Sequence, residues 1–212
     1  SGKPVWKKDL QADFAAPMPD WGFTCSPLVV GNVLFVEVGA KGASVVAFKK
    51  ATGEVLWKSG DDRVAYSSPV AFKLGDDSCL ACFLAPGLVV LKSADGSEVC
   101  RHLWKTSYDV NAATPIITGD RIFLSSGYDS GSALVQVGKA GAMVLWQNKN
   151  MRNQFNSSVL WDGHLYGFDD APELRCIDVK DGSVKWSQSG LGKGSLMLAE
   201  GKLIVLSEKG EL

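Results

Sequence analysis

The sequence predicts an all-β fold assembled from a repeated unit, and two observations support this prediction. Tryptophan recurs at intervals of 40 to 51 residues, at Trp6, Trp57, Trp104, Trp146 and Trp186, and all but the first follow a glycine turn. Between them, short runs of β-branched and aromatic residues alternate with Gly, Asn and Asp turns, without the periodicity of an amphipathic helix. Such a repeat predicts supersecondary units that stack on one another to form a core.

The composition is that of a globular protein. The 212 residues have a net charge of −1, 46% hydrophobic residues and 21% charged residues. No apolar run reaches the roughly 18 residues that span a bilayer, so no transmembrane segment is expected. No basic cluster exceeds two adjacent Lys or Arg residues, so nucleic acid is not an expected partner. Five cysteines leave at least one thiol unpaired within the chain, and we expect all five to be buried as small apolar residues.

The first unit shows the order of its strands. Ser26-Pro27 precede an apolar run that turns at Gly31-Asn32 and returns, which predicts a β-hairpin. A second hairpin turns at Thr52-Gly53 and ends at Trp57, and later units repeat this order from a Ser or Thr at the strand head. Four short antiparallel strands per unit, repeated radially, predict the blades of a β-propeller, with a stacked β-solenoid as the alternative.

The predicted blades occupy residues 22–57, 65–104, 110–146 and 155–186, and a partial blade occupies residues 193–212. The fifth unit stops where its third strand should begin, so the sequence predicts about four and a half blades. An outer strand around Trp6 could complete that unit and close a small ring. The favoured interpretation is a single partial propeller that belongs to a seven- or eight-bladed ring.

The repeated tryptophans have a predicted structural role. An indole buries on the order of 200 Å² and offers one N–H donor. On the outermost strand of a blade it can lie across the next blade and donate into it, which explains the residue type and the period. We therefore predict docking between blades for four side chains: Trp57, Trp104, Trp146 and Trp186.

Residues 47–57 resemble the tryptophan-docking motif of pyrroloquinoline-quinone (PQQ) repeat propellers, Ala-x-Asp-x-x-Thr-Gly-Lys/Glu-x-x-Trp, with Lys49 in place of the aspartate. Residues 176–186 fit the same frame, residues 135–146 fit with one extra residue, and the second unit fits only with an insertion after Gly96. The sequence is thus similar to the PQQ-like propeller repeat proteins, which include quinoprotein alcohol dehydrogenases and the outer-membrane assembly factor BamB. This resemblance implies a periplasmic or secreted propeller and is specific for fold rather than function.

The segments that follow each tryptophan are long and polar, and we expect them to share one face of the disc. They supply seven candidate residues around the mouth of a central funnel: Arg63, Tyr66, Lys105, Asn111, Arg152, Asn156 and Lys193. When the units are aligned on the Ser or Thr at the strand head, Thr24, Ala112 and Phe155 are also expected at this mouth. One interpretation is that these side chains cap strand ends and tie blades together. The other is a cationic, amide-rich funnel for a small anionic or carbonyl-bearing ligand, such as a quinone carboxylate or phosphate, or for a protein partner.

No catalytic residue and no metal ligand is assigned from the sequence. The resemblance makes PQQ and Ca²⁺ possible cofactors, but the adjacent cysteine pair found in many quinoprotein dehydrogenases is missing. Asp169-Asp170 could offer hard oxygen ligands, although an acidic surface loop is the favoured interpretation. The predicted function is a non-catalytic binding or scaffold module of the bacterial cell envelope. The alternative is a PQQ- and Ca²⁺-dependent dehydrogenase of alcohols or sugars, or a fragment of one.

Overall fold

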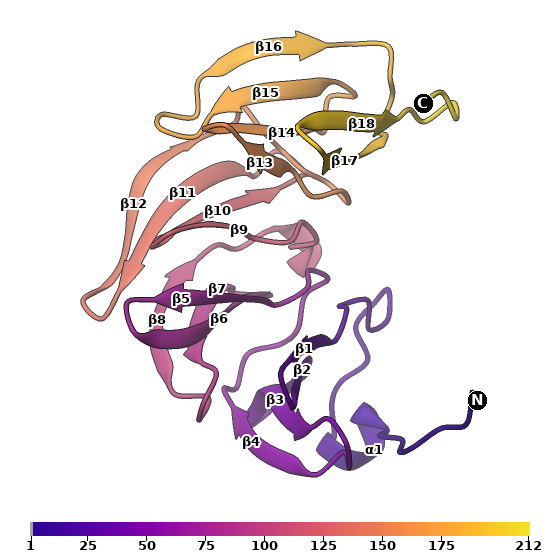
Figure 1. The fold of residues 1–212 in the computed structure, drawn as a ribbon, viewed down its shortest axis with the longest axis vertical. Coiled ribbons are helices and arrows are strands. Elements are labelled where there is room, and N and C mark those ends of the chain that lie inside the picture. Colours follow the sequence, from indigo (N-terminus) through magenta and orange to yellow (C-terminus); the bar gives the residue numbers. More distant parts are fainter. Residues whose placement is uncertain (1) are drawn as a thin grey trace.

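The computed structural model describes residues 2–212, and its regular structure is almost entirely β. Four sheets each contain four antiparallel strands in chain order, and a fifth sheet contains two strands. The sheets follow one another along a curved array, from the first sheet at the bottom of Figure 1 to the two-stranded sheet at the top, and they do not close into a ring. This arrangement is a partial β-propeller, so the predicted fold class is confirmed and the β-solenoid alternative does not hold.

The sheets are called blades below. Blade 1 comprises β1 (Leu28–Val30), β2 (Val33–Ala40), β3 (Ala43–Lys49) and β4 (Val55–Ser59). Blade 2 comprises β5 (Val70–Leu74), β6 (Asp77–Leu84), β7 (Gly87–Lys92) and β8 (Glu98–Leu103). Blade 3 comprises β9 (Ile116–Thr118), β10 (Arg121–Ser126), β11 (Gly131–Gly138) and β12 (Gly141–Asn148). Blade 4 comprises β13 (Val159–Trp161), β14 (His164–Phe168), β15 (Leu174–Asp178) and β16 (Val184–Gln188), and the half blade comprises β17 (Ser195–Ala199) and β18 (Lys202–Leu206).

The hydrophobic core consists of layers between neighbouring blades. One cluster joins Phe83 and Val90 of blade 2 to Ile122 of blade 3, and another joins Phe35 of blade 1 to Leu80 of blade 2. First strands of successive blades contact each other, as β1 contacts β5 and β5 contacts β9. Each blade therefore depends on its neighbours for burial, and the loops that enter the first strands are brought together on one face.

Two tryptophans bridge neighbouring blades in the same way. Trp57 donates from Nε1 to Ser93 O at 3.1 Å, and Trp146 donates to Val179 O at 2.9 Å. Both acceptors lie in the turn between the third and fourth strands of the next blade. A Cβ at Gly96 or Gly182 in those turns would lie 2.6 or 2.7 Å from an indole atom, respectively. Both positions therefore need glycine for two reasons: the backbone has φ near +70°, and the indole ring leaves no room for a Cβ.

Blade 2 differs from blades 1 and 3 in the position of its tryptophan. In blade 1, Trp57 pairs with Ala47 of the third strand. The equivalent pair in blade 2 is Cys100 with Val90, and the same one-residue bulge precedes Trp57 and Cys100 on their strands. Trp104 lies beyond β8 and donates from Nε1 to the Ser126 hydroxyl of blade 3 at 3.1 Å. Trp104 thus hydrogen-bonds into the next blade, although from a position beyond the outer strand. It is buried at the junction of blades 2 and 3 and does not cover the glycine turn of blade 3. All five cysteines are free, and all but the partly exposed Cys25 are buried.

The segment before blade 1 differs from the predicted strand around Trp6. Residues near Trp6 belong to no strand, and a short helix, α1 (Leu10–Phe14), follows. The Asp9 side chain caps this helix by accepting from the backbone N–H groups of Gln11 and Ala12. A five-residue helix is too short to leave a periodic signal in the sequence, so its absence from the prediction has a simple cause. No helix within residues 2–212 is long and apolar enough to cross a membrane.

Candidate binding site at the inter-blade loop face

Hydrogen bonds tie the loops that enter the first strands of successive blades. Thr24 Oγ1 donates to Tyr66 O at 3.2 Å, and Tyr66 N donates to Asn111 O at 3.1 Å. Asn156 continues this series by donating from Nδ2 to the Gly194 carbonyl. The backbone of this face is thus fixed from blade to blade, which is what the strand-tying interpretation expects of Asn156.

Asn111 is a fully buried connector. Its Nδ2 donates to Leu84 O at 2.9 Å, and its Oδ1 accepts from the hydroxyls of Ser126 at 2.9 Å and Thr106 at 3.3 Å. Ser126 in turn accepts from the Trp104 indole. Because Asn111 has no exposed surface, its side chain joins blades 2 and 3 and does not reach a ligand at the mouth.

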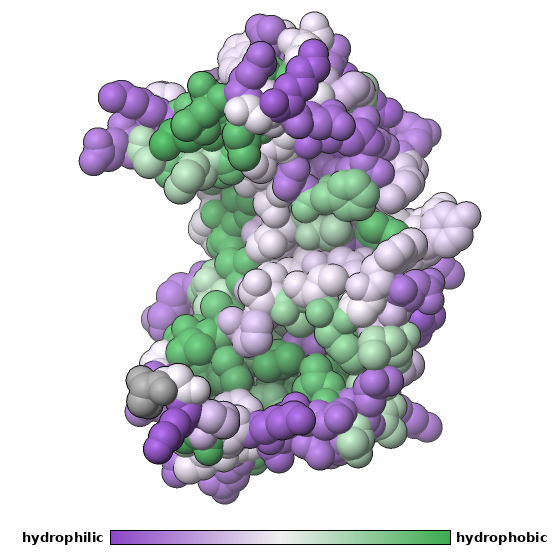
Figure 2. Space-filling view, turned by 90° about the vertical axis from the view of Figure 1, so that its right-hand side faces the viewer, coloured by the Kyte–Doolittle hydropathy of each residue, from purple (hydrophilic) through white to green (hydrophobic). Residues whose placement is uncertain are grey.

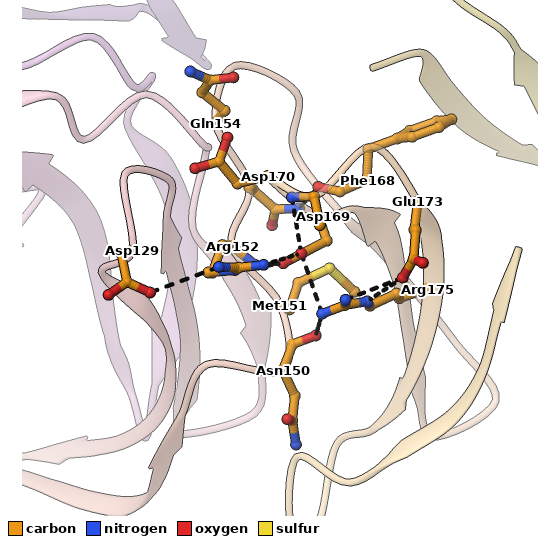
Figure 3. Close-up of polar contacts among 12 residues, drawn as sticks. Asp129, Asn150, Met151, Arg152, Gln154, Phe168, Asp169, Asp170, Glu173 and Arg175 are labelled. Atoms are coloured by element: carbon orange, nitrogen blue, oxygen red, sulfur yellow. Dashed lines mark hydrogen bonds and ion pairs between the residues drawn. The ribbon is translucent and has the colours of Figure 1, made fainter. Parts of the chain in front are cut away.

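Arg152 is held by a buried carboxylate. Its Nε and Nη2 donate to the two oxygens of Asp169 at 3.1 and 2.6 Å, and its backbone N–H donates to the same group at 2.8 Å. Arg175 reaches Asp169 from the other side at 3.2 Å, and both guanidinium groups point at this carboxylate in Figure 3. Hydrogen bonding to Asp169 raises the pKa of Arg152. Asp169 is fully buried, so the predicted acidic surface loop is corrected at this position.

The other candidate cations do not line a cationic funnel either. Lys193 pairs with Asp170 at 3.0 Å and also contacts Gln154. Arg63 pairs with Asp109 at 3.4 Å. Lys105 is exposed on the loop after β8 and lines no pocket among the described residues. The expected cationic, amide-rich funnel is therefore replaced by ion pairs that neutralise most of these groups.

An aromatic pocket occupies this face instead. Its volume is about 490 Å³, and it is lined by Trp21, Thr24, Tyr66, Val110, Ala112, Tyr128 and Phe155. We call it the aromatic pocket. Of the seven candidate ligand-binding residues, Tyr66 lines it, and so do Thr24, Ala112 and Phe155, which the repeat alignment placed at the same mouth. Asn156 and Lys193 border a much smaller depression beside Phe155. The volume lies in the range of small-ligand sites, roughly 300–1,000 Å³.

Each aromatic wall comes from a different loop. Trp21 lies in a turn closed by a hydrogen bond from Gly22 N to Pro19 O at 2.9 Å, and its ring meets Tyr66 edge-on at 5.4 Å between centroids. Tyr128 lies in the turn between β10 and β11 with φ of 54°, and its backbone N–H donates to Asp170 at 2.9 Å. Phe155 lies in the loop before β13. The exposed fractions of Trp21, Tyr128 and Phe155 are 59%, 44% and 62%, values that leave the ring faces accessible.

Two of the aromatic residues that line the pocket, Trp21 and Tyr128, were outside the predicted set. The alignment of the repeats was used to search only the segments that follow each tryptophan. Tyr128 lies in the turn between second and third strands, which also opens on this face. Trp21 lies before the first repeat. The signal available for Tyr128 was an aromatic residue in a Gly-Tyr-Asp turn, because the turn itself does not require an exposed ring.

The aromatic pocket does not fit PQQ with Ca²⁺. Quinone carboxylates need unpaired cations, whereas the walls are aromatic and Arg152 and Lys193 are bound to aspartates. Ca²⁺ needs several free oxygen ligands, and no group of three or more His, Cys, Asp or Glu within residues 2–212 is placed to hold a metal ion. Asp169, the best hard-ligand candidate in the sequence, is already occupied by two arginines.

Comparison with known proteins agrees with the fold. The family described as outer membrane protein assembly factor BamB matches residues 1–188. The chain belongs to this family. No individual curated protein matches the sequence.

Solved structures resemble this BamB-family chain in fold. BamB from Moraxella catarrhalis superimposes with a TM-score of 0.65 at 14% identity, over 90% of this chain and 62% of that one. Quinohemoprotein alcohol dehydrogenase from Comamonas testosteroni gives 0.64 at 14% identity, over 88% and 40%. The computationally designed Ika8 protein gives 0.63 at 10% identity, over 87% and 55%. The chain thus spans less than two thirds of these structures, and identities this low speak for the fold alone.

Proposed function

We propose that this protein is a non-catalytic binding module of the bacterial cell envelope that holds a partner protein segment in the aromatic pocket. The observation that carries the proposal is a set of accessible aromatic rings on loops fixed by hydrogen bonds between blades. Rigid scaffolds that present such loops are a common basis of recognition. The envelope location is supported by membership of a family named for an outer membrane assembly factor.

The chemistry of the pocket favours a protein segment over a small anion. An anion would need cations that are free to face it, and the ion pairs of Arg63, Arg152 and Lys193 would have to be broken first. Exposed Trp, Tyr and Phe side chains are instead enriched at the centres of protein interfaces, where they supply most of the binding free energy. The partner is therefore expected to bring apolar groups and neutral hydrogen-bonding groups.

Site-specific photocrosslinking in cells tests the proposal. A benzophenone amino acid at position 155 should give a discrete adduct with one envelope protein. The same group at position 108 is the control, because Tyr108 is 74% exposed on a neighbouring loop and does not line the pocket. Equal adducts from both positions, or none from position 155, would contradict the proposal.

A titration with PQQ and excess Ca²⁺ addresses the dehydrogenase alternative. Saturable binding followed by dye reduction with an alcohol would replace the binding-module proposal.

A further inference from the structure

The aromatic pocket presents ring faces and hydrogen-bond donors without an unpaired charge on its walls. We propose that it binds a proline-rich peptide segment in the polyproline II conformation. This inference deepens the proposed function and rests on it, because it names the chemical class of the partner segment.

The ring arrangement suits pyrrolidine rings. Trp21 and Tyr66 meet at an interplanar angle of 67°, so together they form a corner with two differently oriented faces. Tyr128 and Phe155 complete the lining from blade 3 and from the loop before blade 4. Aromatic-lined grooves of this composition recognise proline-rich segments by packing ring against ring, and the preformed peptide loses little entropy on binding.

The polar tips of the walls favour a ligand rich in acceptors. The Trp21 indole N–H and the hydroxyls of Tyr66 and Tyr128 form no hydrogen bond with any residue between 2 and 212. The indole group donates only. A polyproline II segment has no internal hydrogen bonds, and proline contributes a carbonyl acceptor without an N–H donor. A segment of this kind therefore satisfies the donors without burying unpaired donors of its own.

The charges around the pocket point the same way. Tyr128 N is anchored on Asp170, whose other contact is Lys193, and Arg63 is matched by Asp109. Neither sign is left in excess among these groups, so the electrostatic complement of the site is a neutral segment. One turn of polyproline II contains three residues and is about 9 Å long, a size that a pocket of about 490 Å³ can hold.

Indole resonances in a ¹⁵N-labelled sample provide the test. The protein has seven tryptophans, and the Trp21 signal is assigned by its loss in Trp21→Phe. Titration with a decaproline peptide should shift the Trp21 signal in a saturable manner and leave the signal of Trp186, on the outer strand of blade 4, unchanged. A Gly-Ser decapeptide of equal length tests for nonspecific peptide binding, and tetramethylammonium tests for a site that recognises cations through its rings.

Variants of exposed residues refine the test without threatening the fold. Phe155→Ala should weaken decaproline binding at least about tenfold, and Tyr128→Phe, which removes a hydroxyl alone, about threefold. Tyr108→Ala is the matched control and should bind within about twofold of the parent protein.

The inference is overturned if decaproline leaves the Trp21 signal unchanged, if the Gly-Ser peptide binds as well, or if Phe155→Ala binds normally. A response to tetramethylammonium alone would assign the site to organic cations. These outcomes are separate from failure of the proposed function. A position-specific crosslink at residue 155 to a partner without a proline-rich segment would sustain the binding module and remove the peptide class.

Discussion

The two ends of the blade array are built differently. At the first end, α1 and its flanking residues cover blade 1: Phe14 packs edge-on against Phe48 at 5.9 Å, and Trp6 donates to Lys50 O at 2.8 Å. At the other end, the half blade exposes 57% of Met197 and 44% of Leu206. Hydrophobic surface is visible there at the upper end of the molecule, where β17 and β18 lie (Figure 2). Trp186 is 42% exposed and donates to no residue between 2 and 212.

The difference shows which parts of a blade interface are interchangeable. Trp6 is not on a strand, yet its indole covers Gly53 in the way that Trp57 covers Gly96. At blade 1, a segment that is not a sheet supplies both the indole above the glycine turn, through Trp6, and apolar cover of the face, through α1. The array does not require that the cover be another sheet.

Removing the cover of blade 1 should have the largest effect on stability. Deletion of residues 2–16 exposes Phe48 and Val46, which are now almost fully buried, and removes the Trp6 indole. We expect a loss of more than about 5 kcal/mol in the free energy of unfolding, measured by urea denaturation. Deletion of residues 209–212, all exposed, is the control and should change stability by less than about 1 kcal/mol. Similar midpoints for both deletions would contradict the comparison.

Single tryptophan substitutions should separate docked from undocked indoles. Trp57→Ala removes a partly buried ring and its hydrogen bond to Ser93, at a cost of about 3–4 kcal/mol. Trp186→Ala removes a half-exposed ring without a hydrogen bond and should cost about 1 kcal/mol. Thermal and urea unfolding of both variants give the difference. Equal costs would mean that packing within the blade, rather than docking on the next blade, determines the effect.

Two fully buried carboxyl groups extend the comparison to the two halves of the array. Asp169 is held by two arginines, whereas Glu37, between blades 1 and 2, forms no ion pair with any residue from 2 to 212 and has only the Cys82 thiol beside its carboxyl group. Burial raises the pKa of Glu37 to about 8. As pH rises, the unfolded chain therefore loses this proton near pH 4.5, whereas the folded protein keeps it until about pH 8. The contribution of Glu37 to the free energy of unfolding is thus full below pH about 4.5 and is lost as pH rises to about 8.

Glu37→Gln should remove that pH dependence. The variant should be more stable than the parent protein above pH 8, by on the order of 3 kcal/mol, and close to it below pH 5. Asp169→Asn is the counterpart and should be less stable at neutral pH, because it leaves two guanidinium groups without their shared carboxylate. Urea unfolding across this pH range checks both. A parallel pH profile for Glu37→Gln and the parent would show that the carboxyl is ionised in the folded protein.

The repeat made the blades predictable because turn residues and strand formers recur in a fixed order. The same spacing could have placed Cys100 at the position on the outer strand that Trp57 occupies in blade 1, since Cys100 follows Gly96 at the distance that separates Gly53 from Trp57. The residue type led the prediction to place Trp104 on the outer strand, which ends at Leu103. The helix at residues 10–14 was beyond reach, because its formation depends on a cap at Asp9 and on contact with Phe48 rather than on its own periodicity.

The site was less predictable than the fold. Spacing brought Tyr66, Asn156 and Lys193 to the correct face, since all three precede first strands. It could not tell that Lys193 turns to Asp170 or that Asn111 is buried, because ion pairing and burial depend on side chains from other blades. Tyr66 and Phe155 share the repeat frame, but Trp21 and Tyr128 come from loops outside it, so only the three-dimensional structure brings all four rings together.

The smallest predicted effect isolates the contact between glycine and indole. Gly53 and Gly201 have nearly equal φ of 72° and 71°, so alanine should cost each about 1 kcal/mol through the backbone. A Cβ at Gly53 would lie 2.7 Å from Trp6, whereas at Gly201 its nearest contact is 3.6 Å from Trp161. Gly53→Ala should therefore cost about 1–2 kcal/mol more than Gly201→Ala in urea unfolding. This excess should vanish when Gly53→Ala is made in the Trp6→Ala protein, because the ring that the methyl group displaces is then gone. An excess that persists would assign the need for glycine to the turn backbone and remove the indole from the explanation.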